Sequence, residues 1–348
     1  MGSDVYFVNL RARSPRENKI SKIQRLFETA GFGNFLNEGD LTAVKLHFGE
    51  KGNDSYINPV YVRQIVDKIK SRNAKPFITD TNTLYSGSRS NAVDHIITAI
   101  EHGFDYSVVG APIIISDGLL SKNSEDVSIN KKHFSQVKIS GDIFHADSMI
   151  VMSHFKGHEM AGFGGSIKNL AMGCAPAAGK QQQHSTVKPK IKNSKCIGCA
   201  KCYRVCPEGA IAIAEKKASI DTKTCIGCGE CITVCPAKAI SPNWQTDIDP
   251  FLERMTEYAL GAVANKQGKV GYINFLINIT PDCDCVPWSD APIVPDIGIL
   301  ASLDPVAIDK ASLDLVNREM GFMNSLLTCN HEHGKDKFMG IRQDVNGY

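Results

Sequence analysis

The apolar positions of the chain fall into short runs and helically spaced sets, a pattern typical of α/β proteins. Short, mainly apolar runs occur at residues 5–8, 43–46, 76–79, 113–115 and 149–152. Runs of this length predict strands buried on both faces, as in a parallel sheet. Residues 59–72 and 89–102 carry apolar side chains three and four positions apart, which predicts helices between the strands. Such alternation predicts right-handed crossovers and a parallel sheet.

The same pattern resumes after a cysteine-rich segment. There the periodicity predicts helices and strands, in the order helix 249–265, strand 270–279, strand 297–300 and helix 305–320. Because α/β elements lie on both sides, we expect the cysteine-rich segment to be an inserted domain. We divide the chain into residues 1–186 and 243–348, which form the α/β domain, and residues 187–242, which form an inserted α+β domain.

Eight of the twelve cysteines form two copies of the motif C-x2-C-x2-C-x3-C-P, and the second copy lies 29 residues after the first. This spacing is typical of bacterial ferredoxins with two [4Fe–4S] clusters, in which the fourth cysteine of each motif ligates the other cluster. The expected ligands of the first cluster are Cys196, Cys199, Cys202 and Cys235. Those of the second are Cys225, Cys228, Cys231 and Cys206.

Zinc and disulfide bonds are the alternatives for these cysteines. Zinc sites usually use C-x2-C pairs separated by a longer spacer, and disulfides form in oxidising compartments. The beginning of the chain, MGSDVYFVNL, lacks the features of a secretory leader. We therefore expect a cytoplasmic iron–sulfur protein, with low-potential clusters suited to an anaerobic host.

Composition and charge limit the classes of binding partner that we expect. The chain has 348 residues, 43% of them hydrophobic and 22% charged, and a formal net charge of +2. Its apolar runs stay well short of the roughly 18 residues that a membrane span requires. The charge gives no reason to expect nucleic acid. We expect an electron-transfer protein or redox enzyme as partner, together with a small-molecule substrate.

A second informative segment covers residues 153–184. Its glycines Gly162, Gly164 and Gly165 follow a predicted strand and precede a predicted helix, a place where parallel sheets usually bind ligands and helix N-termini bind anions. Neither standard phosphate-binding fingerprint is complete, so tight backbone packing is the alternative role for the glycines. Several side chains with acid, base or ligand chemistry surround this loop: His154, His158, Glu159, Lys168, Cys174 and His184.

Five segments together resemble the DUF362 family: VKLHFGEKGN (44–53), FITDTNTLYSGSR (77–89), SHFKGHEMAGFGGSIKNLAMGC (153–174), TPDCDC (280–285) and DIGILASLDPVAID (296–309). The resemblance extends over nearly the whole chain. It implies an α/β protein that often carries a two-cluster ferredoxin domain at this position. It implies no particular activity.

The order and spacing of His158, Lys168 and His184 are also similar to the active site of nickel-dependent lactate racemase. That resemblance implies a two-lobed α/β fold, an acid/base role for His158, a nickel-pincer nucleotide on Lys168, and nickel ligation by His184. The sequence departs from the racemase pattern at residues 79–85, TDTNTLY, where a second acid/base histidine is missing. We therefore do not expect racemase activity, and the nickel-pincer cofactor is a minor alternative.

Four cysteines lie outside the two motifs: Cys174, Cys283, Cys285 and Cys329. Alternate residues of an extended chain point to opposite sides, so Cys283 and Cys285 can act together only if the chain bends there. Pro281 and Pro287 favour such a bend. The bend would bring together ligands for a third metal or cluster. The candidate ligands are Cys174, His184, Cys283 and Cys285, with His158 as an alternative to His184. A redox-active thiol pair and a structural role are the alternatives.

Other residues carry weaker signals. His47 and Glu50 follow a predicted strand and are second-tier site candidates. Asp304 precedes Pro305, which predicts a helix N-cap. The polar group near the C-terminus resembles a metal-binding tract, but such groups are usually incidental; its members are Cys329, His331, Glu332 and His333.

Two classes of function remain open. In the first, an oxidoreductase passes electrons through two [4Fe–4S] clusters to a substrate or metal site near His158, Lys168 and the Cys283/Cys285 pair. In the second, the chain is a non-catalytic electron-transfer, metal-binding or cofactor-assembly protein. The density of titratable residues at predicted strand ends favours the enzyme.

Overall fold

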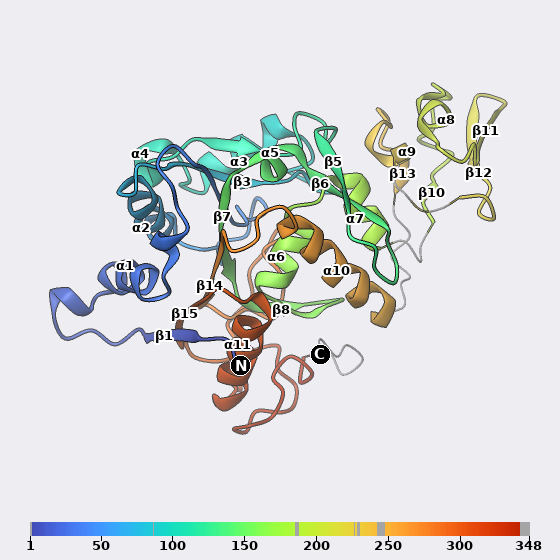
Figure 1. The fold of residues 1–348 in the computed structure, drawn as a ribbon. Helices are drawn as coiled ribbons and strands as arrows, with labels where there is room; N and C mark the ends of the chain where they lie inside the picture. The colour runs from blue at the N-terminus through green and yellow to red at the C-terminus, as the bar shows by residue number, and fades with distance from the viewer. Residues whose placement is uncertain are drawn as a thin grey trace.

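The computed structural model describes residues 2–85, 87–184, 188–225, 227, 230–241 and 248–341. Within this part of the chain, a seven-stranded sheet with the order β1-β15-β14-β7-β2-β3-β4 forms the centre of the molecule (Figure 1). Its strands are β1 (Val5–Asn9), β15 (Gly298–Ser302), β14 (Val270–Leu276), β7 (Ser148–His154), β2 (Leu41–Lys45), β3 (Lys75–Asp80) and β4 (Ile113–Ile115).

Strand direction departs from the sequence prediction at one side of the sheet. The five neighbours from β14 to β4 are parallel, as predicted. However, β15 runs antiparallel to β14, and β1 runs antiparallel to β15. The prediction of a buried parallel strand at residues 5–8 was therefore wrong, because β1 is a half-exposed edge strand. An apolar run shows that a strand is present, but it does not encode the direction of its neighbour.

Helices cover both faces of the sheet. One face packs against α1 (Lys19–Thr29), α2 (Pro59–Lys70), α3 (Ala92–Glu101) and α4 (Tyr106–Val109). The other packs against α5 (Gly141–His145), α6 (Ser166–Gly173), α10 (Ile248–Val263) and α11 (Pro305–Arg318). Strand residues alternate between the two cores: Met149 and Val151 face one, while Ile150 and Met152 face the other. The α/β fold class is confirmed, with strands from both sides of the insertion in one sheet.

Smaller elements complete the α/β domain. A hairpin pairs β5 (Ser124–Ser128) with β6 (Gln136–Ser140), and a second pairs β8 (Lys156–His158) with β9 (Gly162–Gly164). The helix α7 (Ala177–Gln183) packs beside α10. Short 3-10 helices lie at Pro15–Glu17 and Phe32–Asn34.

The cysteine-rich segment forms a separate small module beside α7 (Figure 1). Its elements are β10 (Lys190–Ile191), α8 (Lys201–Val205), β11 (Ile211–Ala214), β12 (Lys217–Ile220), α9 (Glu230–Thr233) and β13 (Ile240–Ser241). Its first strand pairs with its last, which sets Lys190 opposite Ser241. The predicted domain boundaries, residues 187 and 242, lie outside the described residues.

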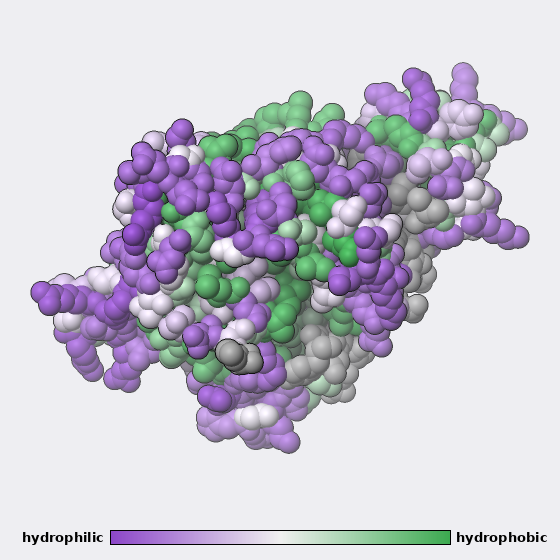
Figure 2. All heavy atoms as spheres, in the orientation of Figure 1, coloured by the Kyte–Doolittle hydropathy of each residue, from purple (hydrophilic) through white to green (hydrophobic). Residues whose placement is uncertain are grey.

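Figure 2 shows one face of the molecule, which is mostly hydrophilic, with hydrophobic residues gathered toward its centre. No helix among the described residues is both long and apolar enough to cross a bilayer.

A close backbone approach holds the β8 hairpin against the loop that follows β14. The N–H of Gly157 donates to the carbonyl of Thr280 at 2.9 Å. A Cβ at Gly157 would collide with the carbonyl oxygen of Pro281, so only glycine allows this approach.

We predict that Gly157→Ala lowers the free energy of unfolding by about 1–3 kcal/mol, the range for forced overpacking, because the clash is with backbone. Urea unfolding followed by circular dichroism measures this effect. Gly2→Ala is the control, since a Cβ there meets no atom within 4 Å. Equal stability of the two variants would show that the loop moves away freely.

Candidate functional site

A cavity of about 650 Å³ opens where four neighbouring parallel strands end. Segments that follow β2, β3, β7 and β14 all contribute to its wall, as expected for the carboxyl edge of a parallel sheet. The helices α6 and α7 close it from one side. Its chemically active lining residues are His47, Glu50, Asp80, Tyr85, Arg89, His158, Glu159, Lys168, Lys180, His184 and Cys285.

The C-x-C segment after β14 is folded into a tight turn. The N–H of Val286 donates to the carbonyl oxygen of Cys283 at 3.0 Å, so four residues beginning at Cys283 form a hydrogen-bonded β-turn. The bend expected from the flanking prolines is therefore present. It places Cys283 and Cys285 on the same side of the chain, which an extended segment could not do.

The central residue of this turn, Asp284, anchors it to the sheet. Its side chain is fully buried and lies 2.8 Å from His154 Nδ1 and 3.3 Å from Lys156 Nζ. The hydroxyl of Ser55 donates to the same carboxylate at 3.0 Å. Burial alone would raise the pKa of Asp284, but His154 and Lys156 outweigh it and hold that pKa well below its usual value. The turn is thus fixed to β7 by a buried ionised group.

The two thiols differ in their electrostatic surroundings. Lys168 Nζ lies 3.4 Å from Cys283 Sγ. The hydrogen bond from the Cys285 side chain, together with Lys168 and Lys156, lowers the pKa of Cys283 well below its usual value despite burial. The pKa of Cys285 is raised by the same contact with Cys283 and by burial. This arrangement favours one thiolate and one thiol.

Lys168 is consequently held as an ammonium ion. Burial disfavours its charge, but the negative charge of the Cys283/Cys285 pair raises its pKa above the usual value. A protonated amine is a poor nucleophile. The environment of Lys168 therefore does not favour covalent attachment of a nickel-pincer nucleotide, and it suits charge stabilisation.

His158 has a defined proton position. Its Nδ1 accepts hydrogen bonds from the backbone N–H groups of Met160 and Ala161, at 3.1 and 3.0 Å. The neutral ring therefore carries its proton on Nε2, which lies 3.7 Å from a carboxylate oxygen of Glu159. This tautomer makes His158 a hydrogen-bond donor at Nε2.

The structure groups His158 with the C-x-C thiols. Among the described residues, His158, Cys283 and Cys285 each offer a ligand atom, and these atoms lie within 4.8 Å of one another. The group therefore allows metal binding. Metal-bound histidines, however, usually donate their second N–H to an oxygen acceptor, whereas the second nitrogen of His158 accepts from two donors.

Two of the candidate ligands for a third site are not in this group. Cys174 is fully buried in the hydrophobic core, where burial raises the pKa of its thiol to about 11. His184 does line the cavity, but its ring stacks on Phe251 with the centroids 4.8 Å apart. Burial, followed by the charge of Lys168, lowers the pKa of His184 to about 3. Of the expected ligands, the described residues therefore group Cys283 and Cys285 with His158, the alternative to His184, and leave out Cys174.

The predicted glycine loop has a different role from the one expected. The backbone N–H groups of Ser166 and Ile167 donate to the carboxylate of Asp309 in α11, at 2.8 and 2.9 Å. An internal carboxylate therefore occupies the N-terminus of α6, where we expected an external anion. A Cβ at Gly165 would collide with Asp309, which gives this glycine a packing role. The large cavity is not lined by Gly162, Gly164 or Gly165.

Sequence reasoning missed several buried charges that support the cavity. Lys45 Nζ lies 3.0 Å from Asp80, and Arg89 Nε lies 3.1 Å from Glu50. Burial would raise the pKa of Asp80, but Lys45 and its other cationic neighbours lower it. Lys45 is the last residue of β2 and Arg89 lies in the segment after β3, so no local pattern in the sequence pairs either residue with its partner.

Lys180 was missed as well. Its ammonium donates to the Thr81 hydroxyl at 2.6 Å and to the carbonyls of Asn82 and Ala175, at 2.7 and 2.8 Å. Burial lowers the pKa of Lys180 to about 8. Because Lys180 lines the cavity, it is a second group able to exchange a proton near neutral pH.

The surroundings of the weaker site candidates indicate the role of each. His47 lines the cavity, and burial followed by the charge of Arg89 lowers its pKa well below the usual value, so its ring is neutral. Asp304 accepts from the N–H groups of Val306 and Ala307, which confirms the predicted N-cap. The C-terminal group around Cys329 is not among the ligand groupings found in the described residues.

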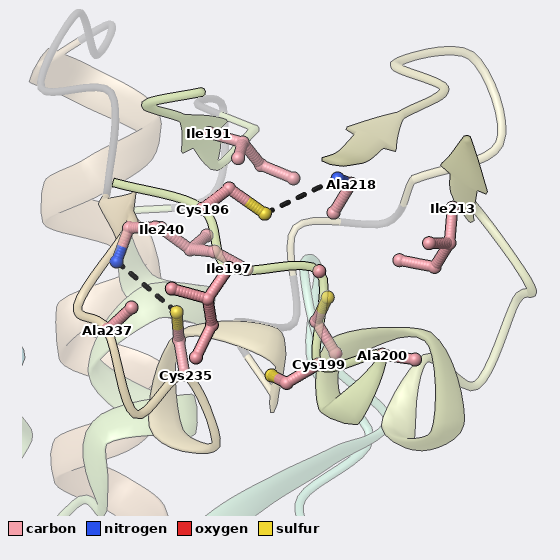
Figure 3. Close-up of a pocket in the computed structure, with 13 residues that line it drawn as sticks. Ile191, Cys196, Ile197, Cys199, Ala200, Ile213, Ala218, Cys235, Ala237 and Ile240 are labelled. Atoms are coloured by element: carbon pink, nitrogen blue, oxygen red, sulfur yellow. Dashed lines mark hydrogen bonds between the residues drawn. The ribbon is translucent and has the colours of Figure 1, made fainter. Parts of the chain in front are cut away.

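The small module brings together the first expected set of cysteines. One small cavity is lined by Cys196, Cys199, Cys202 and Cys235. Figure 3 shows Cys196 and Cys199, from the loop before α8, together with Cys235, from the segment after α9, at this cavity. Backbone N–H groups donate to two of the sulfur atoms: Ala218 to Cys196 at 3.4 Å and Ala239 to Cys235 at 3.2 Å. Cys235, the last cysteine of the second motif, therefore lies with three cysteines of the first motif.

The second motif shows matching features. The N–H of Ala210 donates to Cys206 Sγ at 3.2 Å, as Ala239 does to Cys235, and that of Gly227 donates to Cys225 Sγ at 3.4 Å. Cys231 lies in α9 and packs in the core of the module. The fourth expected ligand, Cys228, lies outside the described residues.

Fold and site together define an α/β protein with an inserted cysteine-rich module and a His/Cys/Cys group, both compatible with iron–sulfur or metal binding. Residues 42–314 match the domain of unknown function DUF362, and the chain belongs to this family. A search of curated proteins finds no match.

Two solved structures resemble the chain weakly. One is the lactate racemase apoprotein from Thermoanaerobacterium thermosaccharolyticum, with 12% identity, a TM-score of 0.38 and coverage of 73% of this chain and 49% of that one. The other is a Thermotoga maritima protein, with 9% identity, a TM-score of 0.42 and coverage of 84% of this chain and 57% of that one. The chain thus spans about half the length of these structures.

Two aspartates flank the same thiols and allow a matched comparison. We predict that Asp284→Asn lowers the free energy of unfolding by about 3 kcal/mol, because it removes the buried partner of Lys156. Asp282→Asn should lower it by less than about 1 kcal/mol, since an asparagine oxygen can still accept the 3.1 Å hydrogen bond from the exposed Trp288. Urea unfolding at pH 7 measures both values, and equal losses would contradict the anchoring role.

Buried histidines should make stability depend on pH. Burial lowers the pKa of His95 to about 3, whereas an unfolded histidine titrates near 6.5. Between these values the unfolded state binds a proton that the folded state excludes, so stability falls as pH falls, by up to about 1.4 kcal/mol per pH unit.

We predict that His95→Gln abolishes this loss of stability at low pH. The difference in free energy of unfolding between parent and variant should therefore shrink by about 1.4 kcal/mol between pH 6 and pH 5. Urea midpoints at several pH values measure it. His145→Gln, on the surface, is the control, and a similar narrowing with that variant would contradict the burial explanation.

Proposed function

We propose that this protein is an iron–sulfur oxidoreductase whose inserted module holds two [4Fe–4S] clusters and passes electrons to a site in the 650 Å³ cavity. The site comprises His158, Lys168 and the Cys283/Cys285 pair. The observation that carries the proposal is the position of α7. This helix packs against α9 of the module, and it also lines the cavity through Lys180.

The cysteine geometry supports iron–sulfur clusters over zinc in the module. Four thiols from both motifs surround one cavity, as crossed ligation by bacterial-type motifs requires. Backbone N–H groups directed at the sulfur atoms stabilise thiolate charge and influence the potential of a bound cluster. The clusters would supply one-electron transfer.

Contacts between the module and the α/β domain support electron transfer toward the cavity. Besides the α9–α7 packing, Lys122 Nζ lies 3.5 Å from Glu230 in α9, and Lys238 Nζ donates to Ser90 Oγ at 3.4 Å. Because α9 also carries Cys231, the second cluster would lie on the side of the module that faces α7.

The cavity itself favours an enzyme over a protein that only stores or carries clusters. A carrier does not require a large internal cavity lined by a hydrogen-bond donor at His158, an ammonium at Lys168 and a Lys180 of lowered pKa. These groups could bind an anionic substrate and move protons during its reduction.

Crossed ligation can be tested by counting iron. We predict about eight iron atoms per chain after anaerobic reconstitution, and about four in each of the variants Cys199→Ser, Cys235→Ser and Cys206→Ser. The double variant Cys199→Ser/Cys235→Ser should keep about four, because both residues belong to one cluster. Cys199→Ser/Cys206→Ser should keep almost none.

Cys174→Ser and Cys329→Ser are controls that should keep all the iron, since neither belongs to the motifs. The opposite result for the two double variants would show uncrossed ligation. Zinc in place of iron, with no visible absorption from clusters, would overturn the iron–sulfur proposal itself.

A further inference from the structure

We propose that Cys283 and Cys285 form a reversible dithiol–disulfide couple that accepts two electrons at the wall of the cavity. This inference deepens the proposed function and rests on it for the source of electrons. It gives the thiol pair a specific task, which is to convert one-electron delivery by iron–sulfur centres into two-electron chemistry next to a bound substrate.

The turn geometry permits the bond. Cys283 and Cys285 occupy the first and third positions of the β-turn closed by Val286, and their sulfur atoms lie within 4.8 Å of each other. The two side chains already interact through a hydrogen bond. A disulfide therefore requires a small approach of the sulfur atoms within a turn whose backbone is fixed by Asp284.

The two sulfur atoms have different access. Cys285 lines the cavity and is partly exposed, whereas Cys283 is 1% exposed and does not line it. Cys285 can therefore contact a substrate, while Cys283 is the enclosed partner with which it forms the disulfide. A pair with one accessible and one enclosed sulfur is suited to this division of roles.

Charges around the pair favour the reduced state with a single proton. The ammonium of Lys168, 3.4 Å from Cys283 Sγ, stabilises that sulfur as a thiolate. His158 holds its proton on Nε2 and has a ring nitrogen within 4.8 Å of both sulfur atoms. That N–H can donate a hydrogen bond to Cys285 as the disulfide opens, while solvent in the cavity that Cys285 lines supplies the proton.

Reduction of the disulfide takes up two electrons and one proton, and the S–S bond between Cys283 and Cys285 breaks. It leaves a thiolate at Cys283 beside Lys168 and a thiol at Cys285. Two reduced one-electron iron–sulfur centres of the module would supply the two electrons and become oxidised.

A metal ion at the same residues is the competing use of the pair. The Nδ1 of His158 accepts from Met160 and Ala161, so ligation through Nε2 would require the proton to move to a nitrogen that faces two donors. Lys168 also places a positive charge against Cys283, where it would repel a cation. Both contacts favour the thiol pair over a metal.

The experiment begins with the full chain, with its clusters loaded under anaerobic conditions. Samples are equilibrated with glutathione buffers of increasing oxidised fraction, quenched with N-ethylmaleimide, digested and analysed by mass spectrometry. We expect a linked Cys283–Cys285 peptide that appears along a two-electron Nernst curve and is lost after treatment with dithiothreitol. Cys174→Ser and Cys329→Ser should leave the midpoint unchanged.

Lys168→Gln provides a test of mechanism. Without the ammonium the reduced state is less stable, so the equilibrium should shift about tenfold toward the disulfide, which is about 30 mV for a two-electron couple. An unchanged midpoint potential would show that Lys168 does not stabilise the reduced state of the pair. Independent alkylation of Cys283 and Cys285 at every buffer ratio, or a stoichiometric metal that Cys283→Ser releases, would overturn the proposal.

A second measurement separates this inference from the proposed function. The oxidised protein is photoreduced without dithiol, and opening of the Cys283–Cys285 bond is followed beside bleaching of the clusters. Opening in the parent chain, and its loss in Cys199→Ser/Cys206→Ser, supports both proposals. The other outcome is a disulfide that titrates with glutathione but stays closed when the clusters are reduced. That result would support the thiol couple and overturn electron delivery from the module.

Discussion

Compensation of buried charge at the carboxyl edge of the sheet is the constraint on which the site depends. An ionised group removed from water is tolerated only when opposite charges and hydrogen bonds replace its hydration. Here Asp284 meets His154 and Lys156, and Asp80 meets Lys45. Each pair joins segments from different strand ends, so compensation of charge also fixes the relative positions of the loops that form the cavity.

This constraint explains why the chemistry of the site is divided between neighbouring loops. The buried carboxylate of Asp284 ties the C-x-C turn to β7, and this helps to fix the two thiols relative to His158. Lys168 reaches the pair from α6, whose N-terminus is held by Asp309 of the helix α11. The reactive groups therefore lie on short segments, and the strands and helices beneath them hold these segments in position.

The sequence allowed much of this arrangement to be predicted, but not all of it. Apolar runs located the strands, and the position of His158 and Lys168 after one of them placed both at the cavity. The prolines around the C-x-C segment indicated its bend. The order of the strands is not written in any local pattern, so the Lys45–Asp80 pair could not be found this way. The exclusion of Cys174 depends on the packing of α6, which spacing along the chain does not reveal.

The pairing of β10 with β13 has a consequence for the history of the protein. The chain enters and leaves the small module through two adjacent antiparallel strands, with Lys190 beside Ser241. An insertion whose two ends lie side by side occupies no more of the host than a surface loop does. Gain or loss of the whole module in a single genetic event would therefore leave the seven-stranded sheet intact. Every described residue that lines the cavity lies outside the module, so the cavity would remain complete as well.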